Sequence, residues 1–380
     1  MRKLRMGMIG GGQGSFIGEV HRIASRLDGM IDLVCGAFSS TPERSLESGK
    51  ALLIPKNRCY VSFEEMIEKE KLLPPNEKMD FVSIVTPNHM HFAPAKMALE
   101  NGFHVVCDKP MTLTLEEALT LERIAASSDL LFALTHNYPS SPMVQQARSM
   151  VLNGEIGQVR KVVVQYLQGW LSTSLENTGQ KQASWRVDPS KSGIGGALGD
   201  IGTHAHNLVE FVTGLKVVEL AADLGKFGKN RVLDDDGNVL IRLENGAKGS
   251  LSFSQIALGE ENNLAISVYG DKGSFTWQQE NPNELVTRWL DKPKTIYTPN
   301  GVATSATASG FSRIPAGHPE GYLEAFANIY KNFAIHLNNY LAGIKDGQPN
   351  YPGIKEGVRG MQFIYACVNS SENNSEWKKI

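Results

Sequence analysis

The first part of the chain alternates buried strands with helices, and this alternation limits the possible folds more than any other feature. Leu4 to Ile9 is a short apolar strand, a glycine-rich turn follows it, and Glu19 to Ala24 has a helical pattern. Further apolar strands are predicted at Ile31 to Phe38, Met79 to Val85, Phe103 to Cys107 and Leu130 to Thr135. Continuous apolar strands separated by helices indicate a parallel sheet that is covered on both faces.

The length of 380 residues exceeds that of one typical hydrophobic core, so two domains are expected. We predict a first domain over 1–138 and a second over 139–380, with the last helix, Gly353 to Val368, as a candidate to pack back on the first domain. A composition of 41% hydrophobic and 21% charged residues is that of an ordinary globular protein.

Charge and composition exclude several classes of partner. A formal net charge of −2 gives no reason to expect nucleic acid or a membrane surface. No apolar run approaches the ~20 residues of a membrane span. The four cysteines lie without metal-ligand spacing and are interpreted as buried thiols of a cytoplasmic protein: Cys35, Cys59, Cys107 and Cys367.

The glycine-rich turn from Gly10 to Gly18 lies between a strand and a helix, the context in which such a turn binds a dinucleotide. Gly10 and Gly12 match the first two glycines of the usual pattern, whereas Ser15 stands at the third position. Gly18 takes that third role if the turn carries three extra residues. The candidate cofactor contacts of the turn are Gly10, Gly12, Gln13, Gly14, Ser15, Phe16 and Ile17.

The end of the second strand bears on the choice between NAD and NADP. NAD-binding proteins usually carry an acidic residue there for the ribose hydroxyls. Here Ser39 and Ser40 follow the strand, and Arg44 stands one turn later, an arrangement that suits a 2′-phosphate. The alternative is a helix start with a solvated arginine.

Three successive strands of this half end in polar residues, and ligands of open parallel sheets bind at such ends. The segments are Thr86-Pro87-Asn88-His89-Met90-His91, Asp108-Lys109-Pro110 and His136-Asn137-Tyr138. Lys109 is either a functional group or one of the many surface lysines that follow strands. His89 and His91 lack a third ligand at a suitable spacing, so no metal site is predicted.

A glycine-rich segment from Gly195 leads into an apolar, periodic stretch that we interpret as a helix, with Asp200 at or near its N-cap. His204 follows four residues later and therefore shares a helix face with Asp200. A carboxylate beside an imidazole suits proton transfer. The alternative is a capping aspartate and a structural histidine.

The rest of the second half is mostly strands joined by turns such as Asn245-Gly246, which indicates an antiparallel sheet. Such a sheet needs a cover of helices or of a partner subunit. His318 to Tyr322 is predicted to open a long helix that ends at Leu341, and Pro299 to Gly317 is predicted to be a loop.

Together these motifs resemble the glucose-fructose oxidoreductase / inositol dehydrogenase / rhizopine-catabolism (Gfo/Idh/MocA) family over residues 4 to 370. The resemblance is carried, in order, by Gly10-x-Gly12, Thr86-Pro87-Asn88 with His91, Asp108-Lys109-Pro110, Trp185-Arg186, and Asp200 with His204. It implies an α/β protein with an N-terminal Rossmann domain. It further implies a C-terminal α+β domain whose large, mostly antiparallel, open-faced sheet forms a homodimer or homotetramer.

The resemblance also implies roles for single residues. Lys109 would hold the reacting hydroxyl, His204 would be the general base or acid, and Asp200 would orient it. Arg186 would lie near the nicotinamide, and Asp108 departs from the usual glutamate. Ser39, Arg44 and Tyr60 resemble an NADP-holding pattern, so NADP is favoured over NAD. The remaining cofactor candidates are Ser40, Thr86, Pro87, Asn88, His91, Asp108 and Trp185.

The predicted function is an NAD(P)-dependent oxidoreductase that transfers a hydride to or from a secondary alcohol of a sugar, glycoside or cyclitol. Aromatic faces and amide donors suit a polyol, although core packing explains each of these residues equally well. The substrate candidates are Asn137, Tyr138, Trp185, Asp200, His204, His318 and Tyr322. The alternatives are a nicotinamide-assisted glycoside hydrolase and a non-catalytic sugar or cofactor sensor.

Overall fold

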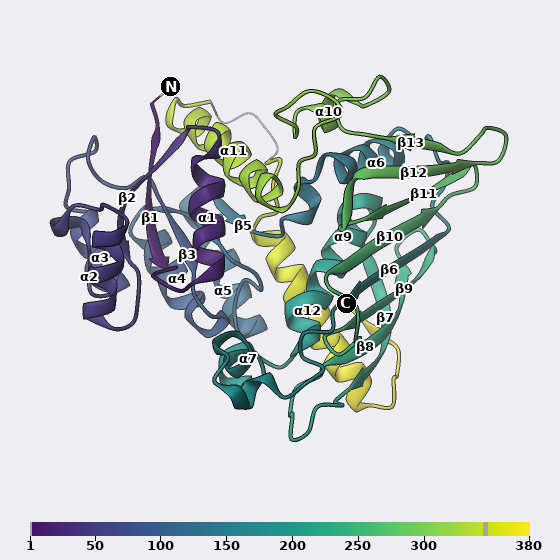
Figure 1. Ribbon diagram of the computed structural model, residues 1–380, viewed down its shortest axis with the longest axis horizontal. Helices are drawn as coiled ribbons and strands as arrows, with labels where there is room; N and C mark the ends of the chain where they lie inside the picture. The colour runs from purple at the N-terminus through teal and green to yellow at the C-terminus, as the bar shows by residue number, and fades with distance from the viewer. Residues whose placement is uncertain (1, 345–348) are drawn as a thin grey trace. The chain divides into compact units, whose positions relative to one another are not determined.

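The computed structural model describes residues 2–344 and 349–380, and the chain divides into two compact units (Figure 1). The first unit comprises the chain up to Asn137 together with Phe326–Val358. The second comprises Tyr138–Ala325 and Arg359–Ile380. Each unit is therefore built from two separate pieces of the chain.

The first unit contains a parallel sheet of five strands in the order β2-β1-β3-β4-β5. Its strands, buried on both faces in the centre, are β1 (Leu4–Gly10), β2 (Ile31–Ala37), β3 (Phe81–Val85), β4 (His104–Cys107) and β5 (Phe132–Leu134). Its helices are α1 (Phe16–Leu27), α2 (Pro42–Ala51), α3 (Phe63–Glu70), α4 (Phe92–Glu100) and α5 (Leu115–Ser128). This is the Rossmann arrangement that the alternating pattern predicts.

On the outer side of β2 the sheet continues as one isolated parallel β-bridge, between Gly36 and Cys59, in place of a further strand. The Tyr60 N–H donates to the carbonyl of Gly36 over 2.9 Å. At this edge the expectation of four buried cysteines is wrong for Cys59, which is only half-buried, because the bridge does not continue into a covered strand. Cys35, Cys107 and Cys367 are buried as predicted.

A late segment of the chain completes the first unit. The part of α11 (Tyr322–Leu341) from Phe326 on packs on the core, where Phe333 contacts Phe81 with ring centroids 5.1 Å apart. The Tyr330 hydroxyl lies 2.7 Å from His21 Nδ1 and 2.7 Å from the Ser83 hydroxyl. Burial lowers the pKa of His21 to about 4, so this imidazole is neutral at physiological pH.

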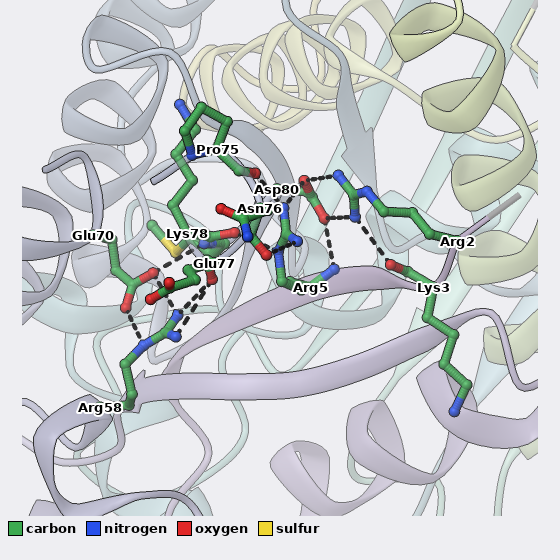
Figure 2. Close-up of polar contacts among 11 residues, drawn as sticks. Arg2, Lys3, Arg5, Arg58, Glu70, Pro75, Asn76, Glu77, Lys78 and Asp80 are labelled. Atoms are coloured by element: carbon green, nitrogen blue, oxygen red, sulfur yellow. Dashed lines mark hydrogen bonds and ion pairs between the residues drawn. The ribbon is translucent and has the colours of Figure 1, made fainter. Parts of the chain in front are cut away.

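Two polar clusters, of which only the one around Glu70 is buried, hold the stretch before β3 (Figure 2). Arg5 on β1 donates to the main-chain carbonyls of Pro75, Asn76 and Lys78 over 2.6–2.7 Å. Glu70, whose side chain is completely buried, accepts hydrogen bonds from Arg58, the Tyr60 hydroxyl and the Met79 N–H. Glu70 thus satisfies the buried N–H of Met79, and Arg5 holds the exposed turn at Pro75 and Asn76.

The second unit contains a sheet of nine strands in the order β13-β12-β11-β10-β6-β9-β8-β7-β14 (Figure 1). Neighbouring strands are antiparallel except for β6 and β9, which are parallel. The strands are β6 (Lys161–Leu167), β7 (Val217–Gly225), β8 (Asp236–Leu243), β9 (Lys248–Ser254), β10 (Asn263–Tyr269), β11 (Gly273–Gln278), β12 (Asn281–Trp289), β13 (Thr295–Tyr297) and β14 (Lys378–Lys379). The short edge strands β13 and β14 are absent from the sequence-based expectation.

Helices cover one face of this sheet. α9 (Thr203–Thr213) packs against β6, β9 and β10, and α6 (Pro142–Leu152) packs against β11 and β12. The other helices are α7 (Lys181–Arg186), α8 (Pro189–Ser192), α10 (Ala306–Ser309) and α12 (Ile354–Glu372). Along β6 and β10 buried residues alternate with partly exposed ones, so the opposite face is only half covered in the single chain.

Two predicted helix starts need adjustment. Asp200 lies near the start of α9, as predicted, but within a π-helical turn, Leu198–Gly202, and not at the cap position, which Gly202 occupies. The helix predicted from His318 begins only at Tyr322, since the N–H of Gly321 is satisfied by the Glu324 carboxylate over 2.8 Å. The predicted loop from Pro299 to Gly317 contains the short helix α10.

Within residues 2–344 and 349–380, no helix combines the length and the hydropathy that crossing a membrane requires.

We predict that Glu70→Ala lowers the free energy of unfolding by about 3–5 kcal/mol, because it leaves a buried arginine and a buried N–H without their acceptor. Urea denaturation measures the change. Glu100→Ala is the matched control, because Glu100 forms a solvent-exposed ion pair with Lys96 and its removal costs less than ~1 kcal/mol. Equal effects of the two substitutions would contradict the importance of the cluster.

Candidate functional site

In the glycine-rich turn the backbone approaches helix α1 closely, as a dinucleotide-binding turn requires. The spacing of its glycines differs from the usual pattern. Gly10 and Gly11 have φ angles of 79° and 71°, in the left-handed region. A Cβ on Gly18 would lie 2.3 Å from the Gly11 Cα, so only glycine lets α1 pack on the turn here. Gly18 thus has the packing role of the third glycine, and Ser15 is the N-cap, accepting from the Gly18 N–H over 3.2 Å.

The outer side of this turn is open. A Cβ on Gly12 would lie 2.7 Å from the Phe38 carbonyl, whereas one on Gly14 would meet nothing within 4 Å. Gln13 and Phe16 are exposed beside Gly14. A bare backbone at the N-terminus of a helix is suited to an anionic pyrophosphate, so the residues present fit a dinucleotide.

The segment after β2 is polar and accessible. Ser40 and Arg44 are exposed, and the Ser39 hydroxyl accepts from the Thr41 N–H over 3.2 Å. Tyr60 differs from the NADP-like pattern, because its ring is buried and its hydroxyl donates to Glu70 over 2.7 Å. Burial and the Glu70 carboxylate raise the pKa of this phenol, so it stays neutral.

His91 lies behind the strand ends rather than on an exposed surface. Its fully buried ring has Nδ1 2.7 Å from the Pro110 carbonyl and Nε2 2.9 Å from the Thr86 carbonyl. The ring therefore joins the segment after β3 to the segment after β4, where the Lys109-Pro110 peptide is cis. Burial lowers the pKa of His91, and a neutral imidazole can donate to only one of these two carbonyls at a time.

Asp108 holds the end of β4. Its carboxylate accepts from the Lys109 N–H over 2.8 Å and from the Thr135 hydroxyl over 2.9 Å. Lys109 is half-buried. Asn137 is buried, and its side-chain NH₂ has no hydrogen-bond partner among the described residues. A buried donor of this kind is usually satisfied by water or a ligand.

In the second unit the Asp200 carboxylate is held from two sides. Arg186 Nε donates to its Oδ2 over 3.0 Å, and the amide of Gln255 donates to the same oxygen over 2.8 Å. The guanidinium of Arg186 also lies 4.4 Å from the ring centroid of Trp185 and 5.9 Å from that of Trp170. The aromatic rings and the ion pair fix the guanidinium plane, which a lysine could not reproduce.

His204 projects from the first turn of α9 into a cluster of tyrosines. Its ring centroid lies 4.9 Å from that of Tyr138 and 6.2 Å from that of Tyr166, both in edge orientations. The two hydroxyls are 2.6 Å apart, and Tyr166 donates to Asn262 over 2.8 Å. Burial raises the pKa of both phenols, so they act as neutral hydrogen-bonding groups beside the imidazole.

The predicted site residues fall into two groups, one in each unit. The structure brings Trp185, Arg186 and Asp200 together in the second unit, with His204 and Tyr138 packed ring to ring. His318 is exposed, with Nδ1 3.2 Å from the Pro315 carbonyl, and Tyr322 is half-buried at the start of α11. No group of three or more potential metal ligands occurs within the described ranges.

Sequence reasoning missed the residues of the sheet that surround Asp200 and His204. Gln255, Tyr166 and Asn262 come from β6 and from the segment that joins β9 to β10. The alternating pattern of these strands predicts which residues face the helices, but not which of them meet α9. A polar Gln255 at the end of a buried strand was the one available signal.

The far end of α9 is anchored by a second buried carboxylate. Glu210 Oε1 lies 2.6 Å from Arg359 of α12 and 3.4 Å from His206, and its Oε2 lies 3.0 Å from Lys216. Burial acts to raise the pKa of Glu210, but His206 and Arg359 outweigh it and leave the pKa far below its usual value. The helix that carries His204 is therefore fixed to both α12 and β7.

Two family models match this chain. Residues 4–136 match an oxidoreductase family with an NAD-binding Rossmann fold, and residues 144–276 match the GFO/IDH/MocA C-terminal domain. The chain is thus an enzyme of the NAD-binding oxidoreductase class. It belongs to the GFO/IDH/MocA family, as the resemblance of its motifs predicts, and the expected two-part α/β fold is confirmed.

Three relatives cover nearly the whole chain. A crystal structure of an oxidoreductase from Sinorhizobium meliloti is 47% identical, with a TM-score of 0.90 and full coverage of both chains. An inositol dehydrogenase homolog from Azotobacter vinelandii, complexed with NAD⁺, is 35% identical with a TM-score of 0.95, covering 100% of this chain and 98% of that one. Levoglucosan dehydrogenase from Pseudarthrobacter phenanthrenivorans is 27% identical over 99% of this chain and 98% of its own.

We predict that the stability of the protein falls more steeply with acid than that of Glu210→Gln. Because the pKa of Glu210 is depressed in the folded state, its contribution is present above the unfolded pKa, about 4.3, and is lost as the pH falls below it. The difference in slope is up to about 1.4 kcal/mol per pH unit. Urea unfolding between about pH 6 and pH 3 measures it, and parallel curves would contradict the anchoring role.

Proposed function

We propose that the protein transfers a hydride between a nicotinamide cofactor and a secondary alcohol of a sugar, glycoside or cyclitol. The observation that carries the proposal is a buried imidazole, His204, four residues after a carboxylate that Arg186 and Gln255 hold in place. The names of the inositol and levoglucosan relatives support a polyol or sugar as the substrate.

When bound, the nicotinamide would accept or donate the hydride. In the direction of oxidation His204 removes the hydroxyl proton, and Lys109 stabilises the charge that develops on the oxygen. A histidine suits this role because its ordinary pKa lies near neutral pH. Asn137, with its unsatisfied buried NH₂, is the group we assign to a substrate or cofactor oxygen.

Asp200 acts on this chemistry through position and charge. Two donors to one oxygen, the Arg186 guanidinium and the Gln255 amide, hold its carboxylate in one orientation. The rings of Tyr138 and Tyr166 support the His204 ring edge to face, so the imidazole keeps its orientation when its charge changes. Tyr138 is therefore assigned to the support of His204, since its hydroxyl is occupied by Tyr166.

The cofactor is assigned as NAD(P), with the turn from Gly10 to Ile17 at the pyrophosphate. The exposed Arg44 and the hydroxyls of Ser39 and Ser40, with no acid beside them, support a 2′-phosphate and therefore NADP. The NAD⁺ and NADH named with structures of the inositol dehydrogenase homolog support NAD instead. Thr86, Pro87 and Asn88 are assigned to the same cofactor, with His91 acting through the segments that it joins.

We further propose a cytoplasmic homodimer or homotetramer. The partly exposed face of the nine-stranded sheet supports self-association, because an extended face of this kind is usually covered. Its outward positions on β6 and β10 include Val163, Leu167 and Ala265. The four free thiols support a reducing compartment.

The central prediction is that His204→Ala lowers kcat by about 10²–10⁴-fold, because it removes the general base. The assay follows nicotinamide absorbance with NAD and NADP separately, against inositols, aldoses, anhydrosugars and glycosides. His336→Gln is the control, because this histidine, unlike His204, belongs to the first unit, with its Nδ1 2.8 Å from the Tyr351 hydroxyl and its ring tilted against the Tyr351 ring.

Turnover that is equal in wild type and His204→Ala would remove His204 from the mechanism. Silence of the wild type across the panel, with cofactor bound, would overturn the dehydrogenase proposal. Release of an aglycone without net change in the cofactor would identify the nicotinamide-assisted hydrolase instead.

A second prediction concerns the cofactor. Arg44→Ala is expected to weaken NADP about tenfold and to leave NAD unchanged, because a charge-assisted contact to the 2′-phosphate is lost. Fluorescence titration with NADPH and NADH measures both dissociation constants. Glu43→Gln tests whether any charge change in the first turn of α2 has the same effect. An unchanged ratio in Arg44→Ala would remove Arg44 from the 2′-phosphate contact, and tighter binding of NADH than of NADPH to the wild type would assign the cofactor as NAD.

A further inference from the structure

The helix that carries Asp200 and His204 begins in a sequence that does not favour a helix. Gly195, Gly196, Gly199 and Gly202 all lie within or just before its first turns. Glycine has the greatest backbone freedom to lose, so the helical state of this segment depends on contacts from outside it. The π-helical turn over Leu198–Gly202 adds a wider and less favourable geometry.

One buried residue supplies those contacts. Asp234, just before β8, accepts hydrogen bonds from the Gly196 N–H over 2.7 Å and from the Leu198 N–H over 2.6 Å, through different carboxylate oxygens. Its main-chain carbonyl accepts from the Ala197 N–H over 2.9 Å. Three successive N–H groups at the start of the helix therefore end on the same residue.

The contacts of Asp234 connect directly to Asp200. The carbonyl of Gly196 accepts from the Asp200 N–H over 3.0 Å, so the position of Gly196 fixes the backbone of Asp200. A Cβ on Gly196 would lie only 2.2 Å from the Asp234 carbonyl, which leaves no room for movement at this junction. His204 follows one helical turn later on the same continuous helix.

We propose that Asp234 is a positioning residue for hydride and proton transfer, setting the start of the π-helical turn and thereby the places of Asp200 and His204. This inference rests on the proposed function. Asp234 does not touch the reacting groups itself, and its effect reaches them through the backbone of Gly196 and Leu198.

The environment of Asp234 favours its protonated form. Burial raises the pKa of this carboxyl to about 6, with Asp235 acting in the same direction and the N–H donors opposing it. The stability that this raised pKa contributes is complete below the unfolded pKa and is lost as the pH rises through 6. The contacts with the N–H groups of Gly196, Ala197 and Leu198, rather than the titration of the carboxyl, therefore carry the positioning role.

The test compares Asp234→Asn with Asp235→Asn. Asp235 is also buried, and its carboxylate accepts from the N–H groups of Phe227 and Gly228 and from Arg231. Among the described residues these side-chain hydrogen bonds lie outside the glycine-rich segment. We expect Asp234→Asn to lower kcat on the order of 100-fold per folded molecule, because one N–H loses its acceptor and the catalytic pair shifts. The cofactor dissociation constant should not change, and Asp235→Asn should retain its kcat.

A second readout does not depend on turnover. The imidazole signals of the nine histidines are followed by NMR, and the signal that disappears in His204→Ala is assigned to His204. Asp234→Asn should move that signal, while Asp235→Asn should leave it in place. A moved signal in a protein that turns over no substrate would support the positioning role and contradict the proposed function.

An unchanged kcat together with an unmoved His204 signal in Asp234→Asn would overturn the proposal. If Asp234→Asn does not fold, Asp234→Glu keeps the charge and displaces the carboxylate, and the same two readouts apply to it. A folded Asp234→Glu with normal kcat and a normal His204 signal would likewise overturn the inference.

Discussion

The ion pair between Arg186 and Asp200 is the interaction on which the candidate chemistry of the second unit depends. It joins a short helix, α7, to the π-helical turn before α9, and Gln255 adds a donor from the end of β9. Three elements that are distant in the sequence thus meet at one carboxylate oxygen. Because charged hydrogen bonds are strong only when their geometry is fixed, the surrounding aromatic and backbone contacts matter as much as the pair itself.

The two ends of α9 are fixed by different means. At its start, backbone N–H groups are satisfied by Asp234, and at its far end Glu210 binds Arg359 and Lys216. Both carboxylates are buried, but burial dominates the pKa of Asp234 whereas the neighbouring cations dominate that of Glu210. A helix that is held at both ends can present one imidazole in one orientation, which is what proton transfer requires.

The sequence was sufficient for the elements whose causes are local. Buried strands, the glycine turn, and the i, i+4 spacing of Asp200 and His204 all depend on neighbouring residues. The sequence was insufficient where contacts between residues far apart in the chain determine the local structure. Asp234, 34 positions after Asp200, accepts the N–H groups of Gly196 and Leu198 where the π-helical turn begins, and Gln255 reaches Asp200 only through the order of the strands. For the same reason the burial of Tyr60 could not be predicted, because its hydroxyl donates to the buried Glu70.

Each unit is completed by a segment from late in the chain, and this has a consequence for biosynthesis. The first unit includes the part of α11 that begins at Phe326. In the second unit the central strand β6 pairs with β9 and β10, which follow it much later in the chain. On the ribosome, therefore, neither unit can close while the chain is still short, and the early strands remain exposed to unwanted association. Nascent chains truncated before Phe326 are accordingly expected to lack the α11 contacts that complete the core of the first unit.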